Sequence, residues 1–248
     1  MKPSQLAIAT LSGLLFSAAA IGHGAHQGGI QAKTDKAIES AFDIVHAKIT
    51  TKGNVATFHM GVAGEAGSLI PKAGGKLAGA SAFAYVWPTS IDSGEVGFDA
   101  GAGILALAVA SHPDFDDTPL FDENGDNNTD NDGDLWHSHW VVLVADDACG
   151  PGKLKVKDIP EGARPKLPKT WPGLPLYIDS PGFDPLLSGD RVEVKVPFDN
   201  IDVVTSASFD GVTSGLRVSA NLHAPLFCVV DVFDVASGDL SLPGKVNQ

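Results

Sequence analysis

The sequence predicts an all-β protein, an antiparallel β-sandwich with long loops that is preceded by a cleaved signal peptide. Glycine (28 residues) and proline (16) are abundant and dispersed, and only 19% of the residues are charged. Apolar side chains recur at every second position rather than at helical spacing. In residues 191–198, "RVEVKVPF", three valines alternate with charged residues, which is typical of a strand with one buried face.

Further strands are indicated along the chain. Residues 215–225 alternate in the same way, while residues 139–145 ("HWVVLVA") and 226–233 ("LFCVVDVF") are continuous apolar runs. Runs of that kind are expected in strands buried on both faces. Residues 32–42 are the one segment that could form a short helix. Turn signals such as Lys52-Gly53-Asn54 separate many of the strands.

The first residues predict export. One lysine precedes an apolar run over residues 6–20, and small residues follow it, so residues 1–22 are expected to be a signal peptide and not a membrane span. Cleavage after Ala20 or after Gly22 fits the small-residue rule. Residues 23–248 are then a single β-sandwich domain of a periplasmic or secreted protein, with no membrane span.

The charge balance excludes some partners. Removing residues 1–22 deletes Lys2 from the 17 basic residues and none of the 30 acidic ones, so the net charge moves from −13 to −14. Such a surface repels nucleic acid and anionic lipid and attracts cations.

Two cysteines, Cys149 and Cys228, are present in a chain expected to be exported, which favours a disulfide over two free thiols or a thiolate metal site. Residues 150–185 are rich in proline and basic by comparison. Since proline does not suit central strands, this segment is expected to be a long surface excursion.

One hairpin can be aligned from the sequence. A turn of two or four residues within 51–54 would place Val45 opposite Met60, Ala47 opposite Phe58 and Ile49 opposite Ala56, with an apolar face. The same register places His46 directly opposite His59, close enough for one metal ion to bind both.

An acidic segment suggests a calcium loop. In residues 121–134, "FDENGDNNTDNDGD", oxygen-bearing side chains occur at every second position, and Gly125 and Gly133 suit tight turns. Hard divalent cations such as Ca²⁺ are bound by six to eight oxygens of this kind. The alternative is a solvated acidic loop. The calcium candidates in 122–134 are Asp122, Asn124, Asp126, Asn128, Asp130, Asp132 and Asp134.

The part "NTDNDGD" of this loop resembles the first half of an EF-hand loop and the aspartate-rich calcium loops of thrombospondin type 3 and dockerin repeats. An EF-hand that begins at Asn128 would carry a bidentate glutamate at its twelfth position, where this chain has His139. The resemblance therefore implies calcium chemistry without the helix–loop–helix fold.

Two histidines follow the acidic loop at strand spacing. On a strand, His137 and His139 project to one face, while Trp136, Ser138 and Trp140 project to the other. A His-x-His pair is a common beginning of a zinc or copper site. The third ligand is expected from His46 and His59, from His112 or from His223. The alternative is a set of hydrogen-bonded or surface histidines.

Two shorter resemblances concern the same chemistry. "HSHW" is similar to the zinc strand of α-class carbonic anhydrases, although nothing else in the chain matches that family. If cleavage precedes His23, the opening "HGAH" resembles the mature start of lytic polysaccharide monooxygenases and of some copper carriers. An unstructured exported tail is the alternative for this end.

These patterns lead to three hypotheses. The first is an exported metal-binding protein with a structural calcium loop and a His-rich copper or zinc site. The second is a secreted metalloenzyme, a copper oxidase or oxygenase or a zinc hydrolase or lyase, that uses the same histidines with Asp99, Asp114 or Asp116 as a base. The third is a carbohydrate or cell-surface ligand-binding module that stacks a glycan or another small molecule on tryptophans, of which Trp171 is expected to be the most exposed. No nucleophile elbow, phosphate loop or nucleotide fingerprint is present.

Overall fold

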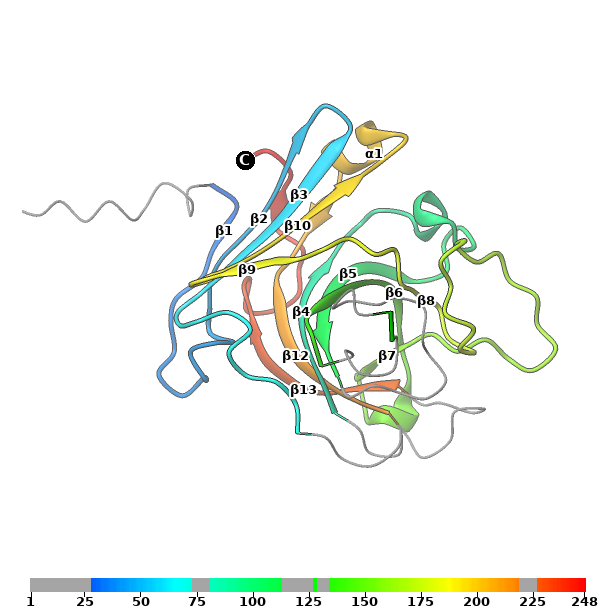
Figure 1. Ribbon diagram of the computed structural model, residues 1–248, viewed down its shortest axis with the longest axis horizontal. Helices are drawn as coiled ribbons and strands as arrows, with labels where there is room; N and C mark the ends of the chain where they lie inside the picture. The colour runs from blue at the N-terminus through cyan, green and yellow to red at the C-terminus, as the bar shows by residue number, and fades with distance from the viewer. Residues whose placement is uncertain (1–27, 73–80, 113–126, 129–133, 219–226) are drawn as a thin grey trace, which may run out of the picture.

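The computed structural model describes residues 28–72, 81–112, 127–128, 134–218 and 227–248 (Figure 1). These residues are nearly all in antiparallel sheets and their connections, which confirms the predicted fold class. The helical elements of the described part are short: η1 (Ser93–Val96), η2 (Asp147–Cys149) and α1 (Ile201–Thr205). Within that part, no helix has the length and apolar character needed to cross a membrane.

A five-stranded antiparallel sheet forms one layer. Its order is β1-β2-β3-β10-β9. The strands are β1 (Ile30–Gln31), β2 (Ile44–Lys52), β3 (Val55–Val62), β9 (Leu186–Ser188) and β10 (Arg191–Pro197). In β10 the three valines are buried and the alternate residues are exposed or half-buried, as the alternation predicts.

The second sheet curves until it closes on itself (Figure 1). Its order is β5-β4-β12-β13-β7-β6-β8, and β5 also pairs with β6. The strands are β4 (Ser81–Pro88), β5 (Ile104–Ser111), β6 (His137–Ala145), β7 (Leu154–Val156), β8 (Ile178–Asp179), β12 (Val212–Val218) and β13 (Phe227–Val235). A small separate sheet pairs β11 (Ser208–Phe209) with β14 (Gly244–Lys245).

Two apolar clusters fill the molecule. The larger one joins the inner face of the five-stranded sheet to the convex face of the closed sheet, where Phe58 meets Trp87 and Trp140 edge-on at centroid distances of 6.0 and 5.9 Å. The smaller one lies on the concave face of the closed sheet and contains many alanines, among them Ala106, Ala108 and Ala110 of β5. These small side chains leave room on the concave face for larger groups from the neighbouring strand.

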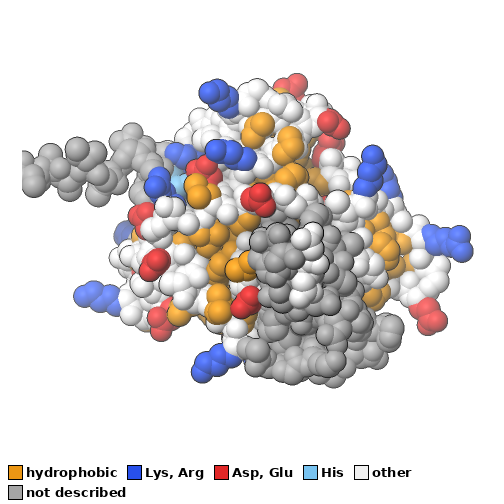
Figure 2. Space-filling view, in the orientation of Figure 1, with side chains coloured by type: hydrophobic (Ala, Val, Ile, Leu, Met, Phe, Trp, Pro, Cys, Tyr) orange, Lys and Arg blue, Asp and Glu red, His pale blue; other side chains and the backbone are white. Residues whose placement is uncertain are grey.

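Figure 2 shows one face of the molecule. On it, apolar side chains lie in several groups, and Lys, Arg, Asp and Glu side chains are scattered around them.

The predicted hairpin exists, but its predicted register was wrong by two residues. Ala47 pairs with Met60 and Ile49 with Phe58, so His46 lies opposite Gly61 and His59 opposite Lys48. The turn falls on Gly53 and Asn54, with Gly53 at φ +61°, a conformation that glycine adopts without strain. A shift of two residues preserves the apolar face, which is why the alternation alone did not distinguish the two registers.

The predicted helix over 32–42 was also wrong. Successive turns occupy this segment, with Ile38 N–H donating to the Asp35 carbonyl and Phe42 N–H to that of Glu39. The Asp43 carboxylate accepts from the Asp35 N–H at 3.1 Å, and the Asp35 carboxylate accepts from Ala37 N–H. Short acidic side chains compete in this way with helical hydrogen bonding.

The two continuous apolar runs differ in outcome. In β6 every residue from Ser138 to Leu143 is buried, as predicted for a strand covered on both faces. In β13 only Cys228 is buried, and Val232 is 43% exposed, so burial on both faces was the wrong expectation there. The reason is its position: β13 pairs along its length with β12, but on its other side the one pair formed among the described residues is Cys228 with Lys155 of β7.

The predicted disulfide joins Cys149 to Cys228. The proline-rich segment 150–185 is mostly irregular, as expected, but it also supplies the short strands β7 and β8 that pair with β6.

Tyr85 ties the start of β6 to the core. Its hydroxyl donates to the Ala41 carbonyl at 2.9 Å and accepts from Gly67 N–H at 2.8 Å, and the Gly67 carbonyl accepts from Trp136 Nε1–H at 3.0 Å. The Tyr85 and Trp136 rings lie 5.0 Å apart. Trp136 immediately precedes β6, so this network helps to set where that strand begins.

Because of Tyr85, the free energy of unfolding should fall at alkaline pH. Burial raises the pKa of Tyr85 from 10.0 to about 12, against a smaller lowering by the Gly67 N–H. The folded pKa lies above the unfolded one, so this stabilisation is complete below pH 10 and is lost as pH rises from 10 to 12. The loss should be about 2–3 kcal/mol, since one pKa unit corresponds to roughly 1.4 kcal/mol.

Urea unfolding of the wild type and of Tyr85→Phe, from neutral pH to about pH 12, measures this contribution. The variant lacks the titrating hydroxyl but keeps the chain's other tyrosine, so the difference between the two curves isolates Tyr85. Parallel curves would contradict the assignment.

Candidate metal centre

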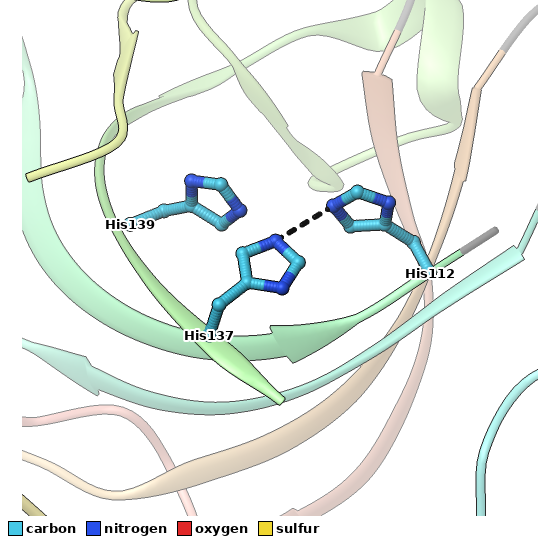
Figure 3. Close-up of side chains that lie close together, drawn as sticks. All are labelled: His112, His137 and His139. Carbon is cyan, nitrogen blue, oxygen red and sulfur yellow. Dashed lines mark hydrogen bonds between the residues drawn. The ribbon is translucent and has the colours of Figure 1, made fainter. Parts of the chain in front are cut away.

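Three histidines, two from β6 and one that directly follows β5, meet on the concave face of the closed sheet (Figure 3). β5 and β6 are antiparallel, with Ala110 opposite His137 and Ala108 opposite His139. His112 follows β5 and comes two residues after Ala110, so strand alternation directs it to the same face. The alanine methyl groups opposite both β6 histidines leave the space that the imidazole rings occupy.

His137 and His112 approach each other directly. Their Nε2 atoms are 3.0 Å apart, and both side chains are half-buried. His137 Nδ1 lies 2.7 Å from the Leu135 carbonyl, which can only accept a hydrogen bond. Nδ1 therefore carries the proton in the neutral ring, and the lone pair is on Nε2, the atom that faces His112.

His139 is the most enclosed of the three, with 7% of its surface exposed. Its Nδ1 lies 3.2 Å from the Asp179 carbonyl and 3.2 Å from Ser180 Oγ. The carbonyl can only accept, so this contact favours the proton on Nδ1, and Ser180 Oγ can accept from the same N–H. Nε2, which is turned toward the other two rings in Figure 3, is buried and has no hydrogen-bond partner among the described residues.

The protonation state of His139 suits a metal ligand. Desolvation by burial holds its pKa well below 6.5, and the neighbouring His137 and His112 lower it further, against a smaller opposing effect of the Asp179 carbonyl. The ring is therefore neutral at physiological pH. A buried nitrogen with an available lone pair and no donor near it is costly unless something else binds it.

The end of the proline-rich segment orients His139. Thr170 Oγ1–H donates to the Asp179 carboxylate at 2.7 Å, and Ser180 N–H donates to the Thr170 carbonyl at 3.1 Å. Burial raises the pKa of Asp179, an effect that the hydrogen bonds from Thr170 and Ser180 oppose. Outer partners of this kind commonly fix the tautomer and orientation of a metal-binding histidine.

The spacing of the nitrogens fits a single metal ion. One ligand nitrogen from each histidine lies within 4.8 Å of the others. In a tetrahedral zinc site with Zn–N of 2.0–2.1 Å, ligand nitrogens are separated by about 3.3 Å. The pair His112–His137, at 3.0 Å, is already near this value. The three side chains could thus hold a transition-metal ion after small rotations.

The other histidine pair expected from the sequence lies elsewhere. His46 and His59 are buried on the five-stranded sheet, on the face opposite the apolar core, with ring centroids 5.3 Å apart. They are diagonal neighbours and not directly opposed, which corrects the predicted pairing. His46 Nε2–H donates to the Gly28 carbonyl at 2.5 Å. Within the described residues, neither ring joins a group of three or more possible metal ligands.

Several predicted sites fall outside the described residues. These are the signal peptide with His23, the candidate ligand His223, the candidate bases Asp114 and Asp116, and the calcium candidates Asp122, Asn124, Asp126, Asp130 and Asp132. Asn128 and Asp134 are described and exposed, and the Asp134 carbonyl accepts from Ser111 Oγ–H at 2.7 Å. The calcium loop stays a prediction.

The proposed base Asp99 has other partners. Its carboxylate accepts from the Tyr177 hydroxyl at 3.0 Å and from Lys166 N–H at 3.1 Å, and it is not part of the histidine cluster. Trp87 and Trp140 are core residues and cannot stack on a glycan. Trp171 is half-buried, and its Nε1–H donates to the Leu176 carbonyl.

From the sequence, His112 was predicted only as one of several possible third ligands. A local signal existed, because residues 108, 110 and 112 share one face of the β5 strand pattern. The missing information was that β5 pairs with β6, across a long intervening segment.

Comparison of the chain with protein-family models, with curated proteins and with solved structures finds no match in any of the three. The function is therefore inferred from the chemistry of the histidine cluster itself.

Proposed function

We propose that this chain is an exported metal-binding protein in which His112, His137 and His139 together bind one transition-metal ion, zinc or copper. The observation that carries the proposal is the buried Nε2 of His139, which has no hydrogen-bond partner in the part of the chain that the structure describes and faces two further imidazoles. Imidazole nitrogen suits both metals, and no thiolate competes, since both cysteines are in the disulfide.

Export is supported by the same disulfide, because such bonds persist in oxidising compartments. The sequence of residues 1–22 supports it independently. In a periplasm or extracellular medium, a three-histidine site of this kind would serve in zinc or copper handling.

Metal loading of the mature chain tests the proposal. After dialysis against zinc or copper, elemental analysis should find one equivalent bound, with calcium measured separately. Simultaneous replacement of His112, His137 and His139 by alanine should abolish this equivalent. His59→Ala is the matched control, since it removes a buried histidine from the other sheet and should leave the metal content unchanged.

The opposite pattern would overturn the assignment. If the triple variant retains a full equivalent while His59→Ala loses it, the ion is bound elsewhere. Circular dichroism of the metal-free variants establishes that each retains the β fold, so that a loss of metal reports on ligands and not on unfolding.

A further inference from the structure

Residues 157–177, the part of the proline-rich segment between β7 and β8, project from the closed sheet as a loop (Figure 1). The base of this 157–177 loop is closed where Ile159 N–H donates to the Pro175 carbonyl at 2.8 Å. Beyond that point most of residues 160–169 are exposed, Lys169 among them. A segment with so little buried surface opens locally at a low free energy unless specific contacts hold it.

Thr170 attaches the loop to the end of β8 at two points. Its carbonyl accepts from Ser180 N–H at 3.1 Å, and its hydroxyl donates to the Asp179 carboxylate at 2.7 Å. Asp179 and Ser180 are buried, with 3% and 8% of their surfaces exposed. Thr170 is half-buried and directly follows the exposed Lys169, so the attachment lies at the end of the exposed stretch.

The same two buried residues contact the proposed metal ligand. The Asp179 carbonyl and Ser180 Oγ each lie 3.2 Å from His139 Nδ1. Hydrogen bonds thus connect His139 to Asp179 and Ser180, and these two residues to Thr170, with no other residue in between. A change at the metal-facing side of the His139 ring therefore has a direct route to the loop.

A metal ion would strengthen this connection. An imidazole that binds a metal through Nε2 keeps its proton on Nδ1, so both oxygens beside Nδ1 act as acceptors. The bound cation also polarises the ring and makes Nδ1–H a stronger donor. β8 depends on such contacts because it has only two residues, which pair with Trp140 and Val141 of β6. Firmer bonding at the end of β8 therefore resists release of Thr170.

We infer that metal binding at His139 and attachment of the 157–177 loop are coupled through Asp179, Ser180 and Thr170, so that the bound ion slows detachment of the loop. By linkage, detachment lowers the affinity for the ion by the same factor by which the ion disfavours detachment. The inference rests on the proposed metal-binding function and deepens it, because it gives the site a means of regulation. A molecule that binds the exposed loop would change metal retention.

Limited trypsin cleavage of the folded mature chain, with and without one equivalent of zinc, tests this inference. Trypsin cuts after lysine and binds an extended segment, so cleavage between Lys169 and Thr170 requires Thr170 to leave the end of β8. Zinc should slow this cut by about 5-fold or more, the lower end of typical coupling between two sites. The bond between Lys52 and Gly53, in the exposed turn of the β2–β3 hairpin, is the control for any effect of zinc on the protease.

Thr170→Val tests the route of the coupling. It removes the hydroxyl bond to Asp179 but keeps the shape of the side chain and the backbone bond to Ser180. The variant should still bind one equivalent of zinc, but zinc should protect the bond after Lys169 less than in the wild type. Thr205→Val is the matched control, because the Thr205 hydroxyl donates to a carbonyl within α1 and its loss should leave the protection unchanged.

The outcomes separate this inference from the proposed function. If one equivalent of zinc binds and both bonds are cut at the same rates with and without it, the coupling is overturned while metal binding stands. If the wild type binds no zinc, the proposed function fails and the inference fails with it. Full protection in a Thr170→Val variant whose circular dichroism matches the wild type would overturn the assigned route. Protection that is weaker in Thr170→Val and absent in His139→Ala would confirm the coupling.

Discussion

Replacement of His139 by alanine is expected to lower the affinity for zinc by more than about 100-fold. The substitution removes the one ligand that is already buried, neutral and oriented by Asp179 and Ser180. Loss of an outer partner of a metal ligand typically costs about 10–100-fold, and loss of the ligand itself should exceed that range. Competition with a chromophoric chelator measures the affinity.

Ser180→Ala provides the graded control. It removes one contact of His139 Nδ1 and leaves the Asp179 carbonyl in place, so zinc affinity should fall by about 10-fold or less. Zinc should also raise the melting temperature of the wild type and of Ser180→Ala, but not of His139→Ala, because ligand binding stabilises the folded state by mass action. Equal zinc affinity in all three proteins would show that His139 is not a ligand.

Removal of the disulfide is expected to cost about 4 kcal/mol of unfolding free energy. Cys149 and Cys228 are 79 residues apart in sequence, and a cross-link over such a distance strongly restricts the unfolded chain. Cys149 is the last residue of η2, which follows β6, so the bond also joins this segment to β13. There the closed sheet has a single pair between β13 and β7. Urea unfolding of the Cys149→Ser/Cys228→Ser double variant measures the cost.

The weak pairing between β7 and β13 indicates which part of the protein should open first when the disulfide is removed. Among the described residues, β13 and β7 are paired at a single position, Cys228 opposite Lys155. The buried Lys155 forms ion pairs with Asp146, at 2.6 Å, and with Asp158. Hydrogen exchange should therefore speed up in β7 and β13 before β2 and β3 are affected. Reductant should destabilise the wild type and leave the double variant unchanged. Unfolding of the two proteins at the same urea concentration would contradict this account.

Local pattern predicted much of this fold. Alternation in β10 and the continuous apolar run of β6 depend on which side chains fit a pleated, covered strand, and both were confirmed. The hairpin register and the burial of β13 depend on partners. Two registers that differ by two residues bury the same face of the hairpin. The exposure of a strand depends on whether another segment covers it, and a short stretch of sequence does not contain that information.

The candidate site divides in the same way. By itself, the sequence determined that His137 and His139 share one face of a strand, since the period of two follows from backbone geometry. It also determined the cysteine pair and the acidic composition. Only the tertiary structure decided that His112 completes the cluster and that His46 and His59 do not. The reason is that closure of the sheet brings β5 beside β6, and such long-range pairing is set by the packing of the whole chain.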